Sequence, residues 1–368
     1  MILERYLHRE VLEKLIWILG LLVLILTSHR FVGFLADAAA GRIPGDLILS
    51  MLLMKMLALF PRLLPAAVFL AVILALTRLA GDKELLIMAG AGVSVKQQLF
   101  YVFKFSFVFA IFVFFVSNFV SPWAEEQVER LKLRAQRESD IAGISAGRFK
   151  EFSRGGRVVY VREVSGDRQQ MQNVFLQVRE AGRFGVLASE SARFHTDTAT
   201  DSRYVLFENG HRYIGRPGQA DFQISDYRAY GVLLEQGHLT ADQREPEAIP
   251  SFELVGTDEP VRIAELQWRA SFVIATLLLP LLAVMLNKFS FGDNRYVSLM
   301  TGILVYFVYS NLLSISRTMV RREDLPAYIG VWWVHLLLLL IIVMMYWRKT
   351  HAYRRRKRNG QQLLPAQP

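Results

Sequence analysis

The chain has 368 residues, of which 53% are hydrophobic and 21% charged, with a formal net charge of +10 and no cysteine. The absence of cysteine excludes a disulfide framework, a cysteine zinc site and a thiol nucleophile. Residues 123–265 hold 19 basic and 23 acidic side chains, so the basic excess of the chain lies in the more apolar remainder. This distribution indicates the orientation of a membrane protein rather than a nucleic-acid surface.

Six segments are apolar enough and long enough to cross a bilayer core of about 30 Å as helices. They are residues 11–35, 47–79, 100–120, 268–286, 296–316 and 327–347. An even number of spans leaves both termini on one side, and the basic tail beginning at Arg348 indicates that this side is cytoplasmic. Three spans precede residues 123–265, which are therefore expected outside the cytoplasm.

The block 123–265 begins with a charged helical stretch, 123–141, that continues the third span. Beyond it the hydrophobic period shortens from about 3.6 to about 2 residues, as in strands. Four runs of β type follow, at 157–164, 173–178, 203–207 and 222–227, with turn signals at 165–167, 181–182 and 209–210. Asn-Gly at 209–210 predicts a hairpin turn because both residues tolerate a positive φ.

These patterns predict an α-helical membrane protein with six transmembrane helices and an inserted all-β domain, a sandwich or jelly roll of eight or more strands. The expected parts are 1–122 with three helices, the β domain 123–265, 266–350 with three more helices, and a basic cytoplasmic tail, 351–368. Within the β domain, residues 241–263 are expected to form a connector back to the membrane.

Patterns that would support catalysis are weak. Gly143-Ile-Ser-Ala-Gly147 matches a nucleophile motif, but a charged helix precedes it and a strand follows, which favours a simple connector. The seven histidines form no pair with the spacing of a helical metal site. No phosphate-binding loop is present, so any ATP is expected to be hydrolysed by another subunit, and we expect no catalytic residue, metal or cofactor in this chain.

Cations inside the apolar segments are a stronger functional signal, because each is costly in lipid unless it reaches water or a partner. Arg30 and Lys55 can extend to the outer interface, whereas Arg62 lies deeper, beside Pro61 and Pro65. Cations suit phosphate groups through charge-assisted hydrogen bonds, and the spans contain no acidic residue that would neutralise them. The predicted cavity for an anionic ligand is lined by Arg30, Lys55, Arg62, Arg317, Arg321 and Arg322.

The cytoplasmic stretch at about 80–97 predicts an amphipathic helix, with Leu85, Ile87 and Met88 toward the bundle and Glu84 pointing outward. One interpretation is a solvated interfacial helix. The other is a coupling helix that inserts into a cytosolic ATPase subunit, with Glu84 as its contact.

Five short motifs lie along the chain: Arg5-Tyr-Leu-His-Arg-Glu10, Leu64-Pro65, Asp82-Lys83-Glu84, Gly92-Val-Ser94 and Ala264-Glu-Leu-Gln-Trp-Arg269. Together with the order of three spans, a β domain and three spans, they resemble the LptF/LptG permease subunits of the lipopolysaccharide exporter of Gram-negative inner membranes. The opening motif and residues 38–44 look more like the F subunits than the G subunits.

The resemblance implies a heterodimer with LptG, two LptB ATPase subunits that bind the ATP and magnesium, and a periplasmic partner, LptC. ATPase coupling would involve Asp82, Lys83, Glu84 and Gly92, and Arg30 and Arg317 would match the basic positions that grip glucosamine phosphates. Lipopolysaccharide would pass from the outer leaflet of the inner membrane onto the β domain. The expected groove lining is Val159, Val161, Phe175 and Tyr230, for which a closed hydrophobic core is the alternative.

Two other functions are compatible with the sequence. The chain could be the paralogous G-type subunit, or a membrane-anchored sensor or scaffold whose β domain binds a periplasmic partner. The scaffold needs neither intramembrane cations nor a coupling helix. A membrane-embedded lipid enzyme is disfavoured, because no acid-base or metal cluster is seen at the interface.

Overall fold

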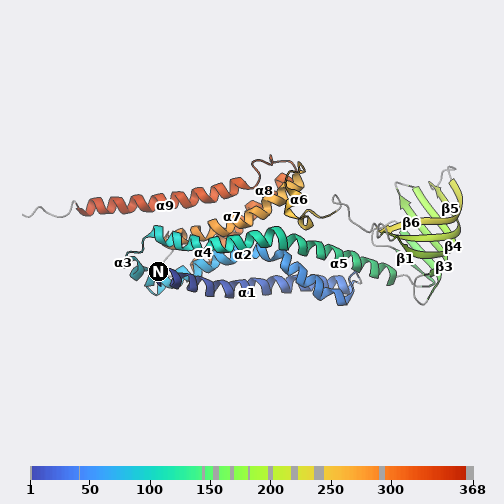
Figure 1. Ribbon diagram of the computed structural model, residues 1–368, viewed down its shortest axis with the longest axis horizontal. Helices are drawn as coiled ribbons and strands as arrows, with labels where there is room; N and C mark the ends of the chain where they lie inside the picture. Colours follow the sequence, from blue (N-terminus) through green and yellow to red (C-terminus); the bar gives the residue numbers. More distant parts are fainter. Residues whose placement is uncertain are drawn as a thin grey trace, which may run out of the picture. The chain divides into compact units, whose positions relative to one another are not determined.

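The computed structural model describes residues 2–40, 42–142, 146–151, 157–165, 170–180, 183–197, 202–216, 223–235, 244–289 and 295–361. They fall into two compact units (Figure 1). The first, which is helical, comprises Met1–Gly33, Leu49–Glu129 and Glu245–Pro368, and the second, which carries a β-sheet, comprises Phe34–Ile48 and Arg130–Arg244.

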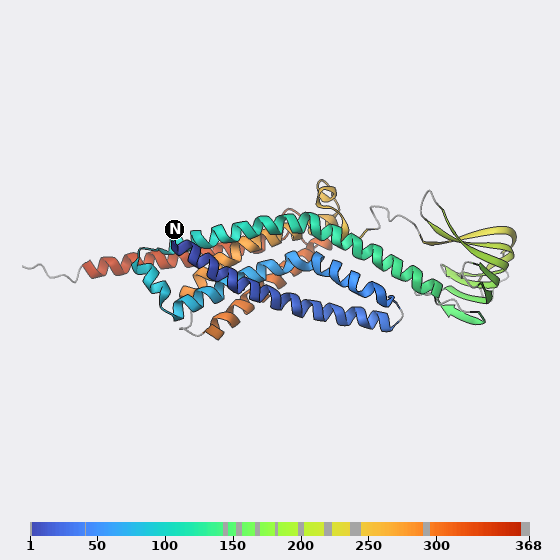
Figure 2. The ribbon, with the colours of Figure 1, turned by 60° about the horizontal axis from the view of Figure 1, so that its bottom comes forward.

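Five described α-helices precede the sheet in the chain, and the last two of them are continuous with each other. The helices are α1 (Ile2–Ala39), α2 (Ile48–Gly81), α3 (Glu84–Gly90), α4 (Val95–Phe115) and α5 (Ser121–Ala142), with a 3₁₀ turn, η1, at Gly45–Leu47. A π-helical turn, η2 (Val116–Val120), joins α4 to α5, and Figure 2 shows the three as one helix. The predicted helical continuation of the third span is therefore confirmed.

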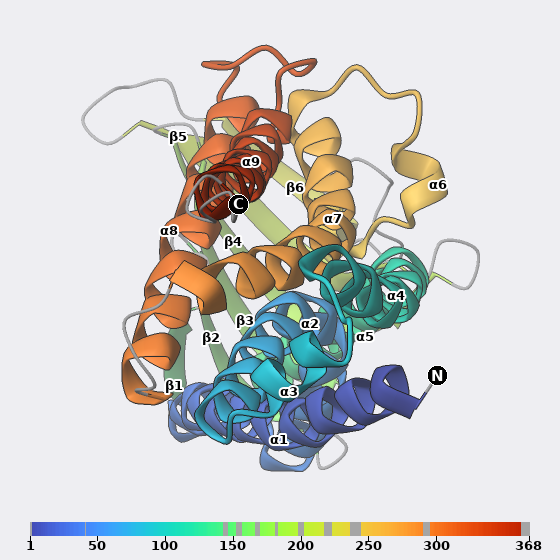
Figure 3. The same cartoon turned by 90° about the vertical axis from the view of Figure 1, so that its left-hand side faces the viewer.

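The helices that follow the sheet are centred on α7. They are α6 (Ser251–Leu254), α7 (Pro260–Phe289), α8 (Arg295–Arg321) and α9 (Trp332–Gln361), preceded by a 3₁₀ turn, η3, at Pro246–Ala248. α7 contacts α4, α8 and α9, and Figure 3, which looks along the bundle, shows it in the middle of these helices.

Five described helical segments are long and apolar enough to span a membrane: Ile2–Ala39, Gly45–Gly81, Val95–Ala135, Pro260–Leu286 and Tyr296–Arg321. The predicted sixth span falls on α9, whose apolar part is the 17 residues Trp332–Arg348. At about 1.5 Å per residue this part covers roughly 25 Å, short of a bilayer core of about 30 Å. Six spans are therefore not confirmed by length.

The core of the helical unit is built around α2, which is apolar on nearly all sides. Ala67, Ala71 and Ala75 are fully buried on it at spacings of four residues. Small side chains at this spacing let neighbouring helices approach closely, which is how helices associate without a hydrophobic driving force in lipid. By contrast, α1 and α8 expose large apolar side chains along most of their length, and such faces suit lipid or another membrane subunit.

The β unit is one six-stranded antiparallel sheet in sequence order. Its strands are β1 (Arg148–Glu151), β2 (Arg157–Val164), β3 (Gln170–Glu180), β4 (Arg183–Thr196), β5 (Arg203–Gly215) and β6 (Gln223–Glu235). Each strand pairs with the next one along the chain, whereas a jelly roll needs strands that cross between two sheets. Among the described strands, a jelly roll of eight or more strands is therefore not confirmed.

The predicted hairpin turn at Asn209-Gly210 is wrong, because both residues lie inside β5. Glu208 pairs with Ser191 and Gly210 with Ser189, so the register is unchanged across Asn209, which has a φ of 50° and lies opposite Glu190. A Cβ on Gly210 would collide with the backbone of β4 and the ring of Tyr227. The glycine therefore serves close strand approach rather than chain reversal.

The four strand runs predicted for the β unit all overlap observed strands, but two observed strands were not predicted. The run at 157–164 coincides with β2, and the other three runs fall within or overlap β3, β5 and β6. β1 and β4 were not expected. The turn at 181–182, most of the turn at 165–167 and most of the Gly143–Gly147 motif lie outside the described residues.

Candidate functional site

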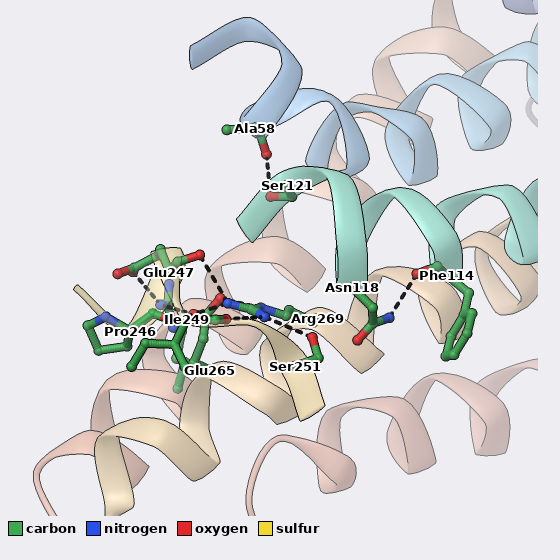
Figure 4. Close-up of polar contacts among 11 residues, drawn as sticks. Ala58, Phe114, Asn118, Ser121, Pro246, Glu247, Ile249, Ser251, Glu265 and Arg269 are labelled. Atoms are coloured by element: carbon green, nitrogen blue, oxygen red, sulfur yellow. Dashed lines mark hydrogen bonds and ion pairs between the residues drawn. The ribbon is translucent and has the colours of Figure 1, made fainter. Parts of the chain in front are cut away.

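The cations predicted in the spans have very different surroundings. Lys55 on α2 donates to both carboxylate oxygens of Glu125 on α5, at 2.7 Å each, and the Glu125 side chain is only 9% exposed. Nearby, the hydroxyl of Ser121 donates at 2.8 Å to the carbonyl of Ala58, three residues before Pro61 (Figure 4). The N–H that Pro61 lacks would have donated to the carbonyl of Leu57, so Ser121 adds its hydrogen bond one residue from the break in the α2 ladder.

Arg317 on α8 is held by two carboxylates. Its Nη2 lies 2.7 Å from Glu247 Oε1 and 2.5 Å from Glu265 Oε2, and its guanidinium stacks 5.0 Å from the ring of Trp268. The inference that no acidic residue neutralises the cations is therefore wrong for Lys55 and Arg317. The acids come from outside the predicted spans: α5, η3 and the first turns of α7.

Donors near Arg317 nevertheless remain unused. Within the described part of the chain, the Arg317 Nε and the indole N–H of Trp268 are buried without hydrogen-bond partners. Arg62, on α2, is partly buried, feels the charges of Glu265 and Arg317, and makes no hydrogen bond or ion pair with any described residue. These donors suit an anionic group.

The remaining predicted cations lie on the surface of the helical unit. Arg30 is exposed on α1, and Arg321 and Arg322 are exposed at the end of α8. Arg321 still acts on Glu247 through its charge. The structure thus brings Arg62 and Arg317 close enough for their charges to interact, whereas Arg30 makes no hydrogen bond or ion pair with either residue.

Arg269 makes five hydrogen bonds in this region, although the sequence analysis predicts no role for it beyond its place at the end of the motif 264–269. All of its N–H groups are directed at acceptors: Glu265 Oε1, the Ser251 hydroxyl and the carbonyls of Pro246, Glu247 and Ile249, at 2.8–3.0 Å. Figure 4 shows these groups around its guanidinium. The side chains of Arg269 and Glu265 are each 4% exposed, so the pair fastens the segment 246–251 to α7.

Gln267 of the same motif fastens the segment between α8 and α9. Its amide donates to the Ala327 carbonyl at 2.6 Å and accepts from the Val331 N–H at 3.2 Å. Gly330, with a φ of 49°, lies so close that a Cβ there would overlap the Gln267 amide. The motif 264–269 therefore holds two chain segments against α7.

Glu247, which lies on η3 outside the predicted spans, has a pKa lower than its ordinary value. Burial raises the pKa of this carboxyl, but the hydrogen bond and charge of Arg317 outweigh burial and hold the pKa below its ordinary value of 4.5. Glu247 therefore stays ionised and binds Arg317 at neutral pH.

The expected coupling segment is a shorter helix than predicted. α3 covers only Glu84–Gly90, and Gly92 follows it with a φ of 89°. Met88 is buried and Leu85 packs partly against the core, whereas Ile87, expected to face the bundle, is 70% exposed. Leu86 is 72% exposed, so α3 presents two large apolar side chains outward.

Glu84 does not point freely outward, because both of its carboxylate oxygens are bound within the chain. Oε1 accepts from Arg78 at 2.9 Å and Oε2 from the Tyr6 hydroxyl at 2.6 Å. Asp82 is exposed and accepts from Arg78 Nε at 3.1 Å. Lys83 precedes α3 in a left-handed conformation with a φ of 61°.

One face of the sheet carries a hydrophobic cluster. Its buried members are Val159, Val161, Met171, Val174, Leu176, Leu187, Ala192, Val205 and Phe207, and Tyr230 packs against them. Phe175 lies between Val174 and Leu176 and pairs with Tyr160, so it belongs to the opposite face. Three of the four expected groove residues therefore share a face with the cluster.

Among the described residues, no three histidine, cysteine or acidic side chains gather as they would around a metal ion.

Comparison with known proteins identifies one family and relatives that share one name. The family model described as lipopolysaccharide export system permease LptF/LptG matches residues 5–348. The lipopolysaccharide export system permease protein LptF of Escherichia coli (strain K12) is 26% identical over 344 residues, which is 92% of each chain. The protein of the same name from Shigella flexneri has the same identity and coverage. Since the family model covers nearly the whole chain, this protein belongs to the LptF/LptG family of lipopolysaccharide export system permeases.

Proposed function

We propose that this chain is the F-type permease subunit of an ABC exporter that extracts lipopolysaccharide from the outer leaflet of the inner membrane. The membership of the chain in a permease family makes it a non-catalytic subunit. The relatives named LptF, at 26% identity, support the F-type assignment over the G-type. ATP and magnesium are then bound by a separate ATPase subunit, LptB, and this chain carries no cofactor.

The observation that carries the proposal is the presence of unused cationic donors in a chain of this family. Arg62 has no partner among the described residues and feels the charge of Arg317, whose Nε is a buried unpaired donor, as is the indole N–H of Trp268. With Arg30, they suit the phosphates of a lipid headgroup. Lys55 contributes less to anion binding, because Glu125 already neutralises it.

The free-energy cost of exposing lipid chains to water explains why such a substrate needs an ATP-driven transporter. Moving a lipid anchor out of the bilayer exposes its chains to water at about 0.8 kcal/mol per CH₂ group. ATP-driven closure of a cavity, followed by transfer along a continuous apolar surface, avoids this exposure. The hydrophobic face around Val161 and Tyr230 is the surface we assign to the transfer, toward LptC and the periplasmic bridge.

The partners follow from the exposed faces of the helical unit. α3 offers Leu86 and Ile87 to a cytosolic ATPase, in two copies of LptB for a pair of permeases. α1 and α8 offer apolar faces to LptG or to lipid. In this arrangement both termini are cytoplasmic and the β unit is periplasmic, which agrees with the basic tail.

The first experiment is an affinity purification of the tagged chain from detergent-solubilised membranes, followed by reconstitution. Co-purification of a second permease and a P-loop ATPase, with ATP-dependent release of lipopolysaccharide, is the expected result. A chain that emerges alone, or only with a periplasmic protein, would favour the scaffold interpretation.

The cation set is tested by photocrosslinking of the complex to lipopolysaccharide. Arg62→Gln and Arg30→Gln are expected to lower the crosslinking yield, while Arg42→Gln, a cation paired with Asp37 outside the set, is the matched control. If the crosslinking yield is unchanged in both variants, neither residue binds lipopolysaccharide. Arg30 then only extends to the membrane interface.

A further inference from the structure

Arg78, in the last turn of α2, joins three helices through a single guanidinium. Its Nη1 lies 2.6 Å from Glu10 of α1, its Nε 3.1 Å from Asp82, and its Nη2 2.9 Å from Glu84 of α3. The hydroxyl of Tyr6, one turn before Glu10, completes the group by donating to Glu84 at 2.6 Å. Figure 1 shows α3 beside the first turns of α1.

The burial of this group separates it from an ordinary surface ion pair. The Glu10 side chain is 8% exposed, and those of Arg78 and Glu84 are 29% and 28% exposed. Exposed pairs contribute little, whereas a charged hydrogen bond in a partly buried network is stronger. The guanidinium reaches the three acids through separate nitrogens of a rigid planar fork, a geometry that the single nitrogen of lysine does not reproduce.

α3 depends on such contacts for its position. A helix of seven residues is too short to be stable by itself in water. Three side chains hold it to the rest of the helical unit: Met88, which is 3% exposed, Leu85, which packs partly against the core, and Glu84, through Arg78 and Tyr6. Because both Glu84 oxygens are engaged, the outward surface of α3 consists of Leu86 and Ile87 instead.

We propose that Arg78 is the positioning residue of the coupling helix, locking Glu84 of α3 to α1 so that a displacement of α3 also moves the first span. The inference rests on the proposed function in one respect, that α3 receives the ATPase subunit. α1 is one uninterrupted helix from Ile2 to Ala39. It carries Arg30 roughly 30 Å beyond Glu10 at about 1.5 Å per residue, so the contact at Arg78 links the ATPase end of the chain to the proposed lipid cavity.

The test uses three variants in the full reconstituted complex. Arg78→Gln removes the contact to all three acids, Arg78→Lys keeps the charge without the fork, and Tyr6→Phe removes one hydrogen bond to Glu84. The matched control is Lys104→Gln, because Lys104 pairs with Glu4 at 2.9 Å between α4 and α1 and does not contact α3. Each complex is measured for yield, ATP hydrolysis, lipopolysaccharide released per ATP, and hydrogen exchange of the α3 amides.

In Arg78→Gln, exchange of the α3 amides is expected to rise about tenfold, because the helix loses its charged contact. Lipopolysaccharide released per ATP is expected to fall at least about fivefold, the lower end of typical coupling between sites. Arg78→Lys and Tyr6→Phe should lie between this variant and the wild type, and the control should match the wild type. A merely stabilising role would lower the yield and leave the ratio of lipopolysaccharide to ATP unchanged.

Unchanged exchange in Arg78→Gln would overturn the proposal, as would raised exchange with an unchanged ratio. A wild-type complex that releases no lipopolysaccharide on ATP addition would instead refute the proposed function. In that case the exchange data still decide whether Arg78 positions α3, so the two failures are distinguishable.

Discussion

Replacing Arg269 by alanine removes the guanidinium that fastens the segment 246–251 to α7. In the wild type it donates to one carboxylate, one hydroxyl and three carbonyls, and its side chain is 4% exposed. After the substitution the three carbonyls lose their charged donor. Glu265 keeps only its contact with Arg317, so the segment is expected to open locally while the helices stay folded.

The magnitude follows from the burial of the pair. Removing one partner of a buried ion pair costs about 3–5 kcal/mol, because the other charge is left uncompensated. Arg317 still compensates Glu265 in part, and the freed carbonyls regain water when the segment opens, which favours the lower end. A loss of about 3 kcal/mol in the free energy of local opening corresponds to roughly a 150-fold change in the opening equilibrium.

Hydrogen exchange of the amides in residues 246–254 measures this opening directly, since exchange follows the population of the open state. Arg269→Lys, which retains the charge but not the fork, should give an intermediate increase. Arg322→Ala is the control, because Arg322 is exposed at the end of α8. An exchange rate in Arg269→Ala within about threefold of the wild type, a difference of well under 1 kcal/mol, would refute the reasoning.

Three further predictions concern stability. Glu247 has a lowered pKa, so it contributes stability above its ordinary value of 4.5 that is lost as pH falls through its folded pKa. Glu247→Gln should flatten that part of the unfolding free energy against pH, and an unaltered slope would contradict the pairing with Arg317. Gly330→Ala should lower stability by about 1–3 kcal/mol through overlap with Gln267, a loss that thermal unfolding would reveal. Gly210→Ala should destabilise the sheet similarly, and wild-type protease resistance would contradict the close approach of Ala188 and Tyr227 to Gly210.

The elements with strong periodic patterns could be predicted from the sequence. α2 and α5 fall close to their expected ranges because long apolar runs and a charged 3.6-residue period leave few alternatives. β4 was missed because Arg183–Thr196 is rich in glycine, alanine and serine, which give little strand signal. At Asn209-Gly210 the local turn preference was outweighed by pairing with the neighbouring strands.

The partners of the charged residues could be predicted only where they are local. The Glu265–Arg269 pair has helical i, i+4 spacing, so its motif could have revealed it. Lys55 and Glu125 are 70 residues apart, and Tyr6 and Glu84 are 78 apart, so no local pattern joins them. Such pairs depend on how the helices pack, which the sequence pattern does not specify.

These ion pairs determine which of the cationic residues remain available to bind an anionic headgroup. A basic side chain attracts an anionic headgroup only to the extent that its charge is not already matched by a carboxylate. Lys55 is matched by Glu125, and Arg317 shares Glu247 and Glu265. Within the described residues, the field available to a phosphate therefore comes mainly from Arg30, Arg62 and Arg322, while part of the charge of Arg321 acts on Glu247. Arg317 then contributes through its unused Nε and by keeping the segment 246–251 in place, which makes its substitution a test of structure as much as of binding.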